Sequence, residues 1–371
     1  MENGVTGRSL GDFVGCGSDT GLPETCSPQA PRCHPRHVSE SSGGLCPEDR
    51  GVSMPREEDK KGCERTTKGK TQTVPRGNLE SAVIEITQSC PLKCVGCYVP
   101  PDPNFMSFKD FKTIIDKTPP MESLNISGGE PLTHPDIVRI LEYAKSKDIS
   151  VSLFTSGYVG HHLLPTILKH LDELRVTLRL PNKLDESYRR VPKSNEQTIN
   201  FLHTAKQLRW ELDLELDIYI HFIVDGFTIA YCEDIRQVAA DVEADVVALP
   251  YLDFTKQNTE RMYEWKTWKE VVLDLEGMGF IVEMVENVCV AGVKRYAVDS
   301  FGMVRPCVYL DLSDLEKMTN KKGDKIWNQT NLITDDWDTV YNALCHWRGQ
   351  IGIYRGRCPA FDNKAIGGKD D

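Results

Sequence analysis

Apolar positions along the middle of the chain follow two patterns, and their alternation predicts the fold class. Short apolar runs rich in β-branched residues predict strands at 82–87, 124–127, 149–157, 174–180, 216–224 and 244–250. Between them, apolar residues recur at helical spacing and predict helices at 106–117, 135–147, 163–174, 198–208 and 232–242. Strands and helices that alternate with short connections form a parallel sheet, in which each helix crosses over from one strand to the next. We therefore expect an α/β core, a partial (β/α)6 barrel, because the alternation ends near residue 280, short of a full barrel.

The segments before and after this core differ from it in composition and in the pattern of apolar residues. Residues 1–78 hold one aromatic residue, no isoleucine and many Gly, Pro, Ser and charged residues, so they predict a disordered N-terminal extension. Residues 79–280 form the expected core. Residues 281–371 begin with alternating strands around a turn at Asp299–Gly302 and continue to a short helix near 335–344, which predicts a small appended β-hairpin and α domain.

Charge and composition narrow the class of protein. The net charge of −11 over 371 residues repels phosphate backbones and argues against a general nucleic-acid binder. No apolar stretch is long enough to cross a bilayer, and the first residues lack the order of a signal peptide, so we expect a cytoplasmic protein with no membrane partner. Thirteen cysteines in such a chain favour metal or cluster ligation over disulfides.

Three of these cysteines fall within ten residues. The stretch SCPLKCVGCY places Cys90, Cys94 and Cys97 at C-x3-C-x2-C spacing directly after the first predicted strand. The carboxyl ends of parallel strands are where α/β sheets carry their chemistry. Three thiolates can hold three irons of a [4Fe–4S] cubane and leave the fourth iron open. An open metal position is typical of a catalytic site, so we expect a small molecule there.

This spacing resembles the signature of the radical S-adenosylmethionine (radical SAM) enzymes. The resemblance implies that Cys90, Cys94 and Cys97 hold the catalytic cluster and that SAM chelates its open iron. One-electron cleavage of SAM then gives a 5′-deoxyadenosyl radical, which abstracts hydrogen from a substrate. GGEP after the second strand is similar to the family's second motif: Gly128, Gly129, Glu130 and Pro131. Its glycines permit close backbone approach, and carbonyls with Glu130 can accept hydrogen bonds from an ammonium group.

The resemblance implies further cofactor-binding residues at the ends of later strands. Ser156 lies where relatives carry an adenosine-contacting Thr-Asn-Gly, Thr177 where they carry a serine, and Arg189 at the spacing of a carboxylate-binding arginine, with Arg190 as its rival. Two positions depart from the family pattern. Gly96 replaces an aromatic residue, with Tyr98 a candidate for packing near the cluster or adenine. Arg179 replaces an acidic residue that binds ribose.

A second group of cysteines lies beyond the core. The series Cys289, Gly302-x4-Cys307 resembles the opening of the SPASM and twitch domains, in which a β-hairpin carries an auxiliary cluster. The resemblance implies one auxiliary [4Fe–4S] cluster on Cys289, Cys307, Cys345 and Cys358, because the further cysteines of a full SPASM pattern are missing. His346 is an alternative fourth ligand, and a zinc-stapled small domain is the structural alternative.

The combined expectation is a radical SAM oxidoreductase or maturase with a low-potential electron donor such as flavodoxin or ferredoxin. A small-molecule substrate, such as a sugar or cofactor precursor, is favoured, because residues 1–78 are too polar to fold into a leader-peptide-binding domain. Alternatives are a maturase that crosslinks or epimerises a ribosomal peptide, an RNA-modifying radical SAM enzyme, and a structural zinc or iron–sulfur protein.

Overall fold

The computed structural model describes residues 63–67, 70–74, 79–252, 265–283, 291–292, 294–310, 312–319 and 322–351. Residues 55–371 belong to one compact unit, and the other unit, 1–54, lies outside the described residues. Most of residues 1–78, for which the sequence predicts disorder, therefore lie outside the described residues. Among those that are described, the structure differs from that expectation in one place: β1 (Cys63–Thr67) and β2 (Lys70–Val74) pair as an antiparallel hairpin. Both strands contain threonines, whose branched side chains favour extended backbone.

The six predicted strands form the central part of a nine-stranded sheet. They are β3 (Ser81–Thr87), β4 (Ser123–Gly128), β5 (Ser150–Thr155), β6 (Glu173–Thr177), β7 (Asp217–Val224) and β8 (Asp245–Pro250). All neighbours among them pair in parallel, in chain order. The short β9 (Ile281–Val282) extends the sheet beyond β8, also in parallel. The α/β fold class is confirmed, and no pairing among the described residues joins the two ends, so the sheet is open.

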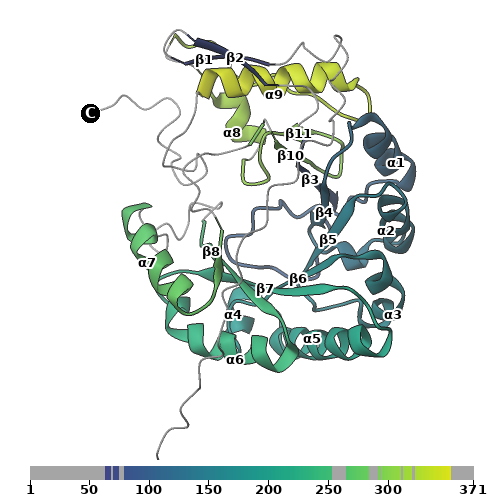
Figure 1. Ribbon diagram of the computed structural model, residues 1–371, viewed down its shortest axis with the longest axis vertical. Coiled ribbons are helices and arrows are strands. Elements are labelled where there is room, and N and C mark those ends of the chain that lie inside the picture. The colour runs from purple at the N-terminus through teal and green to yellow at the C-terminus, as the bar shows by residue number, and fades with distance from the viewer. Residues whose placement is uncertain are drawn as a thin grey trace, which may run out of the picture. The chain divides into compact units, whose positions relative to one another are not determined.

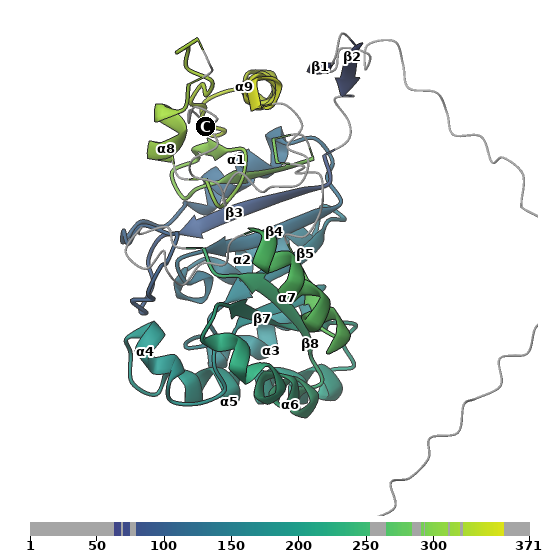
Figure 2. The ribbon, with the colours of Figure 1, turned by 90° about the vertical axis from the view of Figure 1, so that its left-hand side faces the viewer.

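Helices cover the outer side of this curved sheet, as Figures 1 and 2 show. They are α1 (Phe108–Lys117), α2 (Ile137–Lys145), α3 (Leu164–Ile167), α5 (Ser194–Glu211) and α6 (Cys232–Val242), with α7 (Trp265–Gly277) beside β8. Ser107 begins α1 by accepting a hydrogen bond from the Asp110 amide. The helix expected at 163–174 is shorter: single turns η3 (His161–Leu163) and η4 (Leu168–His170) flank α3.

Successive residues of each strand face opposite sides of the sheet. One set is apolar and packs under the helices, as with Ile84, Ile126 and Leu153. The other set, on the inner side, is largely polar: Glu85, Asn125, Ser127, Ser152, Glu173, Arg175 and His221. The inner side of the sheet is therefore more polar than the side that the helices cover.

The C-terminal hairpin joins the same sheet. β10 (Arg295–Val298) pairs in parallel with β3 and antiparallel with β11 (Val304–Arg305). The turn lies where the sequence predicts it, with Gly302 at φ +83°. α8 (Leu312–Lys317) and α9 (Trp337–Ile351) follow. Lys117, at the end of α1, binds the segment before α9. Its Nζ donates to the carbonyls of Leu332, Ile333 and Asp335 at 3.2, 2.7 and 2.8 Å.

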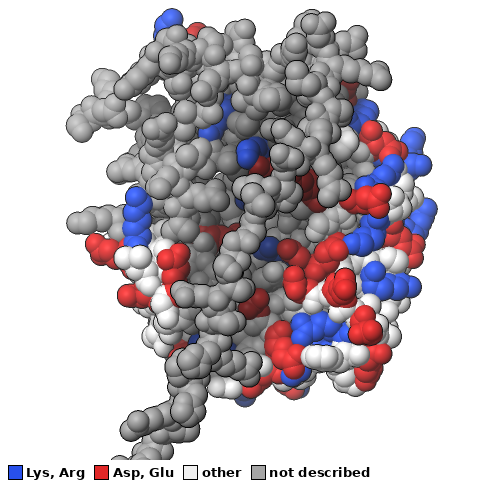
Figure 3. All heavy atoms as spheres, in the orientation of Figure 1, with Lys and Arg blue, Asp and Glu red and all other residues white. Residues whose placement is uncertain are grey.

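Charged side chains of both signs intermingle on the face over α1 and α2 seen in Figure 3, where Lys147 pairs with Asp116 and Arg139 with Asp136. Such mixing gives that face no basic stripe of the kind that tracks a phosphate backbone. None of the helices that the structure describes combines the length and apolar character needed to cross a bilayer.

A buried histidine on the inner face predicts a pH dependence. The His221 Nε2 accepts from Arg175 Nη1 at 3.2 Å, since a guanidinium only donates. Burial, together with the Arg175 charge, lowers the pKa of His221 to about 3. The unfolded chain, with a histidine pKa of about 6.5, then binds one more proton than the folded chain between about pH 6.5 and 3. Folding stability should fall across that window as pH decreases, by at most roughly 1.4 kcal/mol per pH unit.

The measurement is urea unfolding at several pH values between neutral and acid. We expect His221→Gln to flatten the pH dependence of the unfolding free energy in this window, whereas His203→Gln, on the exposed side of α5, should leave it unchanged. If the unfolding free energy changed equally with pH in the wild type and in His221→Gln, the pH dependence would not arise from the lowered pKa of His221.

Candidate functional site

The three-cysteine loop leaves the carboxyl end of β3 and is fixed by backbone hydrogen bonds on two sides. On one side, the Ser89 carbonyl accepts from the Glu130 amide at 2.8 Å. On the other, the Lys93 and Val95 amides donate to the carbonyls of Arg189 and Tyr188 at 3.0 and 2.8 Å. The loop is thus held between the GGEP turn and the short helix α4 (Asp185–Arg189). Cys90, Cys94 and Cys97 therefore sit on a backbone whose path is set by two other segments.

The two glycines of GGEP are required by close contact with the start of this loop. Gly128 has φ +133°, and a Cβ there would lie 2.2 Å from the Thr87 carbonyl oxygen. A Cβ on Gly129 would lie 2.4 Å from the Ser89 carbonyl oxygen. Both contacts are with backbone, which cannot move aside as a flexible side chain can. The glycine pair therefore serves the approach of β4 to the cysteine loop.

Glu130 is surrounded by hydrogen-bond donors of the chain. Its side chain is completely buried and accepts four hydrogen bonds from the chain. Oε1 accepts from the Leu132 amide and the Thr155 hydroxyl at 3.1 and 2.7 Å, and Oε2 from the Ser156 amide and hydroxyl at 2.8 and 2.5 Å. Because a carboxylate has about four acceptor positions, none remains for an ammonium group. Glu130 instead ties the GGEP turn, including the buried Pro131 of η2 (Pro131–Thr133), to the end of β5.

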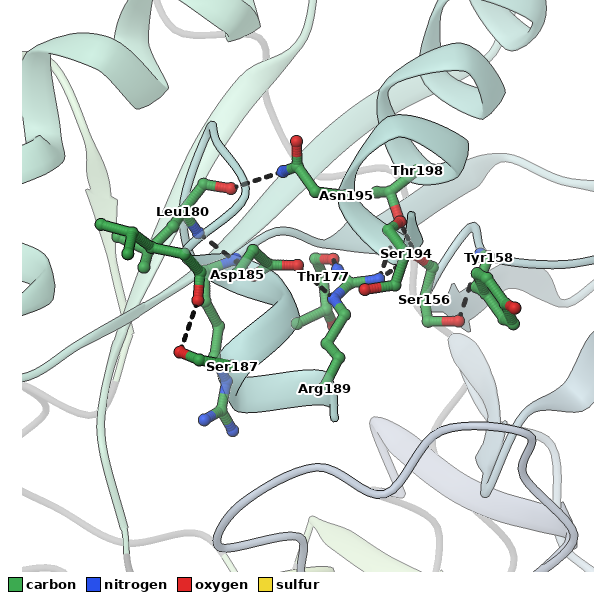
Figure 4. A network of polar contacts seen from close by, with 12 residues as sticks. Ser156, Tyr158, Thr177, Leu180, Asp185, Ser187, Arg189, Ser194, Asn195 and Thr198 are labelled. Atoms are coloured by element: carbon green, nitrogen blue, oxygen red, sulfur yellow. Dashed lines mark hydrogen bonds and ion pairs between the residues drawn. The ribbon is translucent and has the colours of Figure 1, made fainter. Parts of the chain in front are cut away.

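Arg189 uses four of its five N–H groups within the chain, as Figure 4 shows. Its Nε pairs with Asp185 Oδ2 at 2.5 Å, and the two side chains are 3% and 0% exposed. Nη1 donates to the Ser156 carbonyl and the Thr198 hydroxyl at 3.1 and 2.7 Å, and Nη2 donates to the Thr177 carbonyl. Burial raises the pKa of Asp185, opposed by the charges of Arg189 and Arg179. The side chain of Arg189 thus joins the ends of β5 and β6 to α4 and α5.

The space beside Gly96, the residue before the third cysteine, is filled by a side chain from a distant part of the chain. Gly96 has φ +68°, and a Cβ there would lie 2.4 Å from the hydroxyl of Tyr251, which follows β8. The Tyr251 ring therefore lies where a side chain at position 96 would begin. Arg179 lies 5.8 Å from the centre of the same ring and donates from Nη1 to the Val95 carbonyl at 3.3 Å. Tyr251 and Arg179 thus cover the inner part of the cysteine loop.

Tyr98 faces the inner side of the sheet. Its hydroxyl lies 3.2 Å from the Ser127 hydroxyl, and its ring meets that of Tyr309 edge to face, with centroids 6.0 Å apart. Burial, with the Glu85 charge second, raises the pKa of Tyr98. The residue therefore connects the cysteine loop to β4 and to the segment after β11.

The thiols of the loop interact with one another. Cys90 and Cys97 are exposed at the loop surface, yet enough protein surrounds their sulfur atoms that desolvation raises both thiol pKa values, that of Cys90 to about 12. Neighbouring thiols add to both shifts. Binding a metal centre would therefore displace protons. Among the described residues, no group of three or more His, Cys, Asp or Glu side chains is arranged to hold a single metal ion. Three thiols without a fourth donor suit a cubane, in which each cysteine binds a different iron.

A buried ion pair links β3 to the hairpin near the second cysteine group. Arg305 Nη2 lies 2.5 Å from Glu85 Oε2, and the side chains are 7% and 2% exposed. Arg305 Nη1 also donates to the Val308 carbonyl at 3.2 Å. Burial raises the pKa of Glu85, opposed by the Arg305 charge. The pair joins the strand before the cysteine loop to the strand before Cys307.

Two of the four cysteines expected to hold an auxiliary cluster are described. Cys307 follows β11 and Cys345 lies in α9, both half-buried. Cys289 and Cys358 lie outside the described residues. The auxiliary ligand set therefore remains a prediction.

Several residues that shape the site were not identified from the sequence: Glu85, Asp185, Thr198 and Arg305. Only Asp185 carries a local signal, because its spacing of four from Arg189 predicts a helical ion pair. The others meet the site through contacts between distant segments.

Comparison with known proteins identifies the family of this domain. Residues 84–239 match the family model described as the Radical SAM superfamily. The antilisterial bacteriocin subtilosin biosynthesis protein AlbA of Bacillus subtilis is 22% identical over 302 residues, covering 75% of this chain and 63% of AlbA. The chain thus spans less than two thirds of that relative's length. An AdoMet-dependent heme synthase of Oleidesulfovibrio alaskensis is 21% identical, covering 66% of this chain and 74% of the relative.

The fold also resembles solved structures. Streptococcus suis SuiB bound to the precursor peptide SuiA superposes with a TM-score of 0.61 at 16% identity, covering 80% of this chain and 76% of SuiB. The family match covers β3 to α6, the segment that contains the three-cysteine loop, the GGEP turn and Arg189. Residues 84–239 therefore form a domain of the Radical SAM superfamily.

Proposed function

We propose that the chain binds a [4Fe–4S] cluster through Cys90, Cys94 and Cys97, with SAM at the iron that no side chain ligates. The observation that carries this proposal is the backbone framework of the cysteine loop, fixed between the GGEP turn and α4. When bound, the cluster supplies the electron that cleaves SAM to a 5′-deoxyadenosyl radical, which abstracts hydrogen from the substrate.

The chain's own residues position these groups. The glycines let the carbonyls of the GGEP turn reach the amino group of SAM, while Glu130 keeps the turn rigid through its four hydrogen bonds. Ser156 follows β5 and donates to Glu130 of this turn, Thr177 ends β6, and we propose that the nucleoside binds beside them. Tyr98 and Tyr251 exclude water from the inner side of the loop.

The polar inner face supports a polar small molecule as substrate. Arg175 stacks over Phe154 and Tyr219 and pairs with Glu173 at 2.8 Å and Glu283 at 3.1 Å, so its charge is compensated. A face of compensated charges favours a neutral, hydrogen-bonding substrate such as a sugar-like alcohol. We further propose that Cys307 and Cys345, with Cys289 and Cys358, hold an auxiliary [4Fe–4S] cluster, and that flavodoxin or ferredoxin supplies electrons.

Peptide maturation is the second candidate. It is favoured by the likeness to AlbA, a bacteriocin biosynthesis protein, and to SuiB, whose structure contains a precursor peptide. Co-expression with short peptides encoded beside the gene, followed by mass spectrometry of each peptide, separates the two candidates. A peptide mass change that depends on the three cysteines would replace the small-molecule proposal.

The central test is anaerobic reconstitution with iron and sulfide, followed by SAM and dithionite. We expect release of 5′-deoxyadenosine by the wild type and none by Cys94→Ala, because two thiols cannot hold the cubane in place. Cys232→Ala, which removes a thiol buried in α6, is the matched control and should retain release. Activity of the Cys94 variant, or zinc in place of iron, would contradict the proposal.

The same preparation tests the auxiliary cluster. We expect about eight iron atoms per chain for two cubanes and about four for one.

A further inference from the structure

The arginine that the family pattern assigns to the SAM carboxylate has one N–H group left for it, because four of its five already have partners within the chain. Arg189 is 2% exposed, and each of its three guanidinium nitrogens has a partner within the chain. Figure 4 shows these partners on both sides of the side chain. A second carboxylate could bind in the bidentate manner only by displacing Asp185, which is completely buried and would then lose its counter-charge. Breaking such a buried pair is strongly unfavourable, so Arg189 is a poor ligand for SAM.

Arg179 has the opposite properties. It lies two residues beyond Thr177 at the end of β6 and is half-buried. Among the described residues, no ion pair involves Arg179, and its guanidinium makes one hydrogen bond, from Nη1 to the Val95 carbonyl. It therefore retains donors for a ligand, since a guanidinium has five N–H groups.

Two aromatic rings hold the Arg179 guanidinium next to the cysteine loop. The ring centre of Tyr188 lies 5.4 Å from its central carbon and that of Tyr251 lies 5.8 Å away. Its hydrogen bond to Val95 places it on the backbone between Cys94 and Cys97, and its charge lowers the pKa of Cys97 against the larger effect of burial. The guanidinium is thus kept close to the thiols.

The charged side chains around the three-cysteine loop differ in how far their neighbours in the chain compensate them. Asp185 is neutralised by Arg189, and Glu130 is satisfied by its four hydrogen bonds. Arg179 forms no ion pair among the described residues, although its charge, like that of Arg189, lowers the pKa of Asp185. A partly desolvated guanidinium that is not in an ion pair favours an anionic group, and its planar fork suits a carboxylate.

We propose that Arg179 binds the carboxylate of SAM and that Arg189 acts as a positioning residue that fixes the ends of β5, β6 and α4 around it. This inference rests on the proposed function, because it requires SAM to bind beside the cysteine loop.

The test compares two ligands that differ in the carboxylate alone. Binding of SAM and of decarboxylated SAM to the anaerobically reconstituted full chain is measured by equilibrium dialysis, without reductant. The wild type should prefer SAM. Arg179→Met should reduce the ratio of the two affinities by about tenfold or more, as expected for loss of a charge-assisted hydrogen bond. Arg179→Lys keeps the charge without the fork and should give an intermediate ratio.

Arg190→Met is the matched control, since Arg190 is exposed and adjacent to Arg189. It should leave the ratio at the wild-type value. Circular dichroism and cluster absorbance verify that each variant is folded and loaded. An unchanged ratio in Arg179→Met, or a reduced ratio in Arg190→Met, would overturn this assignment while leaving the proposed function intact. Failure of the wild type to bind SAM would overturn both.

Discussion

Gly128→Ala is expected to abolish release of 5′-deoxyadenosine and to lower the unfolding free energy by about 2–4 kcal/mol. The added methyl group would lie 2.2 Å from the Thr87 carbonyl oxygen, on a backbone with φ +133° that side chains rarely adopt. The strand end must then move away from the cysteine loop, and the hydrogen bond from the Gly129 amide to Thr87, now 2.7 Å, is lost with it. Urea unfolding and the 5′-deoxyadenosine assay measure the two effects.

Gly226→Ala is the matched control, because a Cβ at Gly226 would meet no atom within 4 Å. Its unfolding free energy should change by less than about 1 kcal/mol. If Gly128→Ala were as stable and active as this control, the close approach of β4 to the cysteine loop would not be needed for function.

Arg305→Met should destabilise the protein by about 3–5 kcal/mol, because it leaves the Glu85 carboxylate buried without a counter-charge. Removing both charges in Glu85→Leu with Arg305→Met should recover much of that loss, since the desolvation cost of both groups disappears. Denaturant unfolding of the two single variants and the double variant gives the interaction energy directly.

The exposed pair Lys147–Asp116 serves as reference. Its side chains are 38% and 41% exposed, so Lys147→Met should cost less than about 1 kcal/mol. A loss this small for Arg305→Met would show that the buried pair does not hold the hairpin against β3.

The sequence predicts the core well because its signals are local. Buried parallel strands are recognisable as apolar runs, and the helix at 232–242 has the predicted bounds because its apolar spacing is regular. The cysteine spacing and the GGEP turn are equally local, since each lies within one short segment.

Other parts of the site depend on contacts between distant segments. No pattern near Arg189 indicates that the carbonyls of Ser156 and Thr177 would use its donors. Gly96 gives no hint that Tyr251, more than 150 residues later, fills its place. The sequence likewise indicates a hairpin at 294–309 but not its pairing with β3, because strand partners are chosen by the assembled sheet.

The pairing of β10 with β3 makes the strand that leads into the cysteines an interior strand. A chain shortened before Arg295 would leave the hydrogen-bonding groups along one margin of β3 open to other molecules, a known cause of aggregation. The radical SAM core of this protein is therefore not expected to be stable and monomeric by itself, because the last quarter of the polypeptide covers the edge of its first strand, β3.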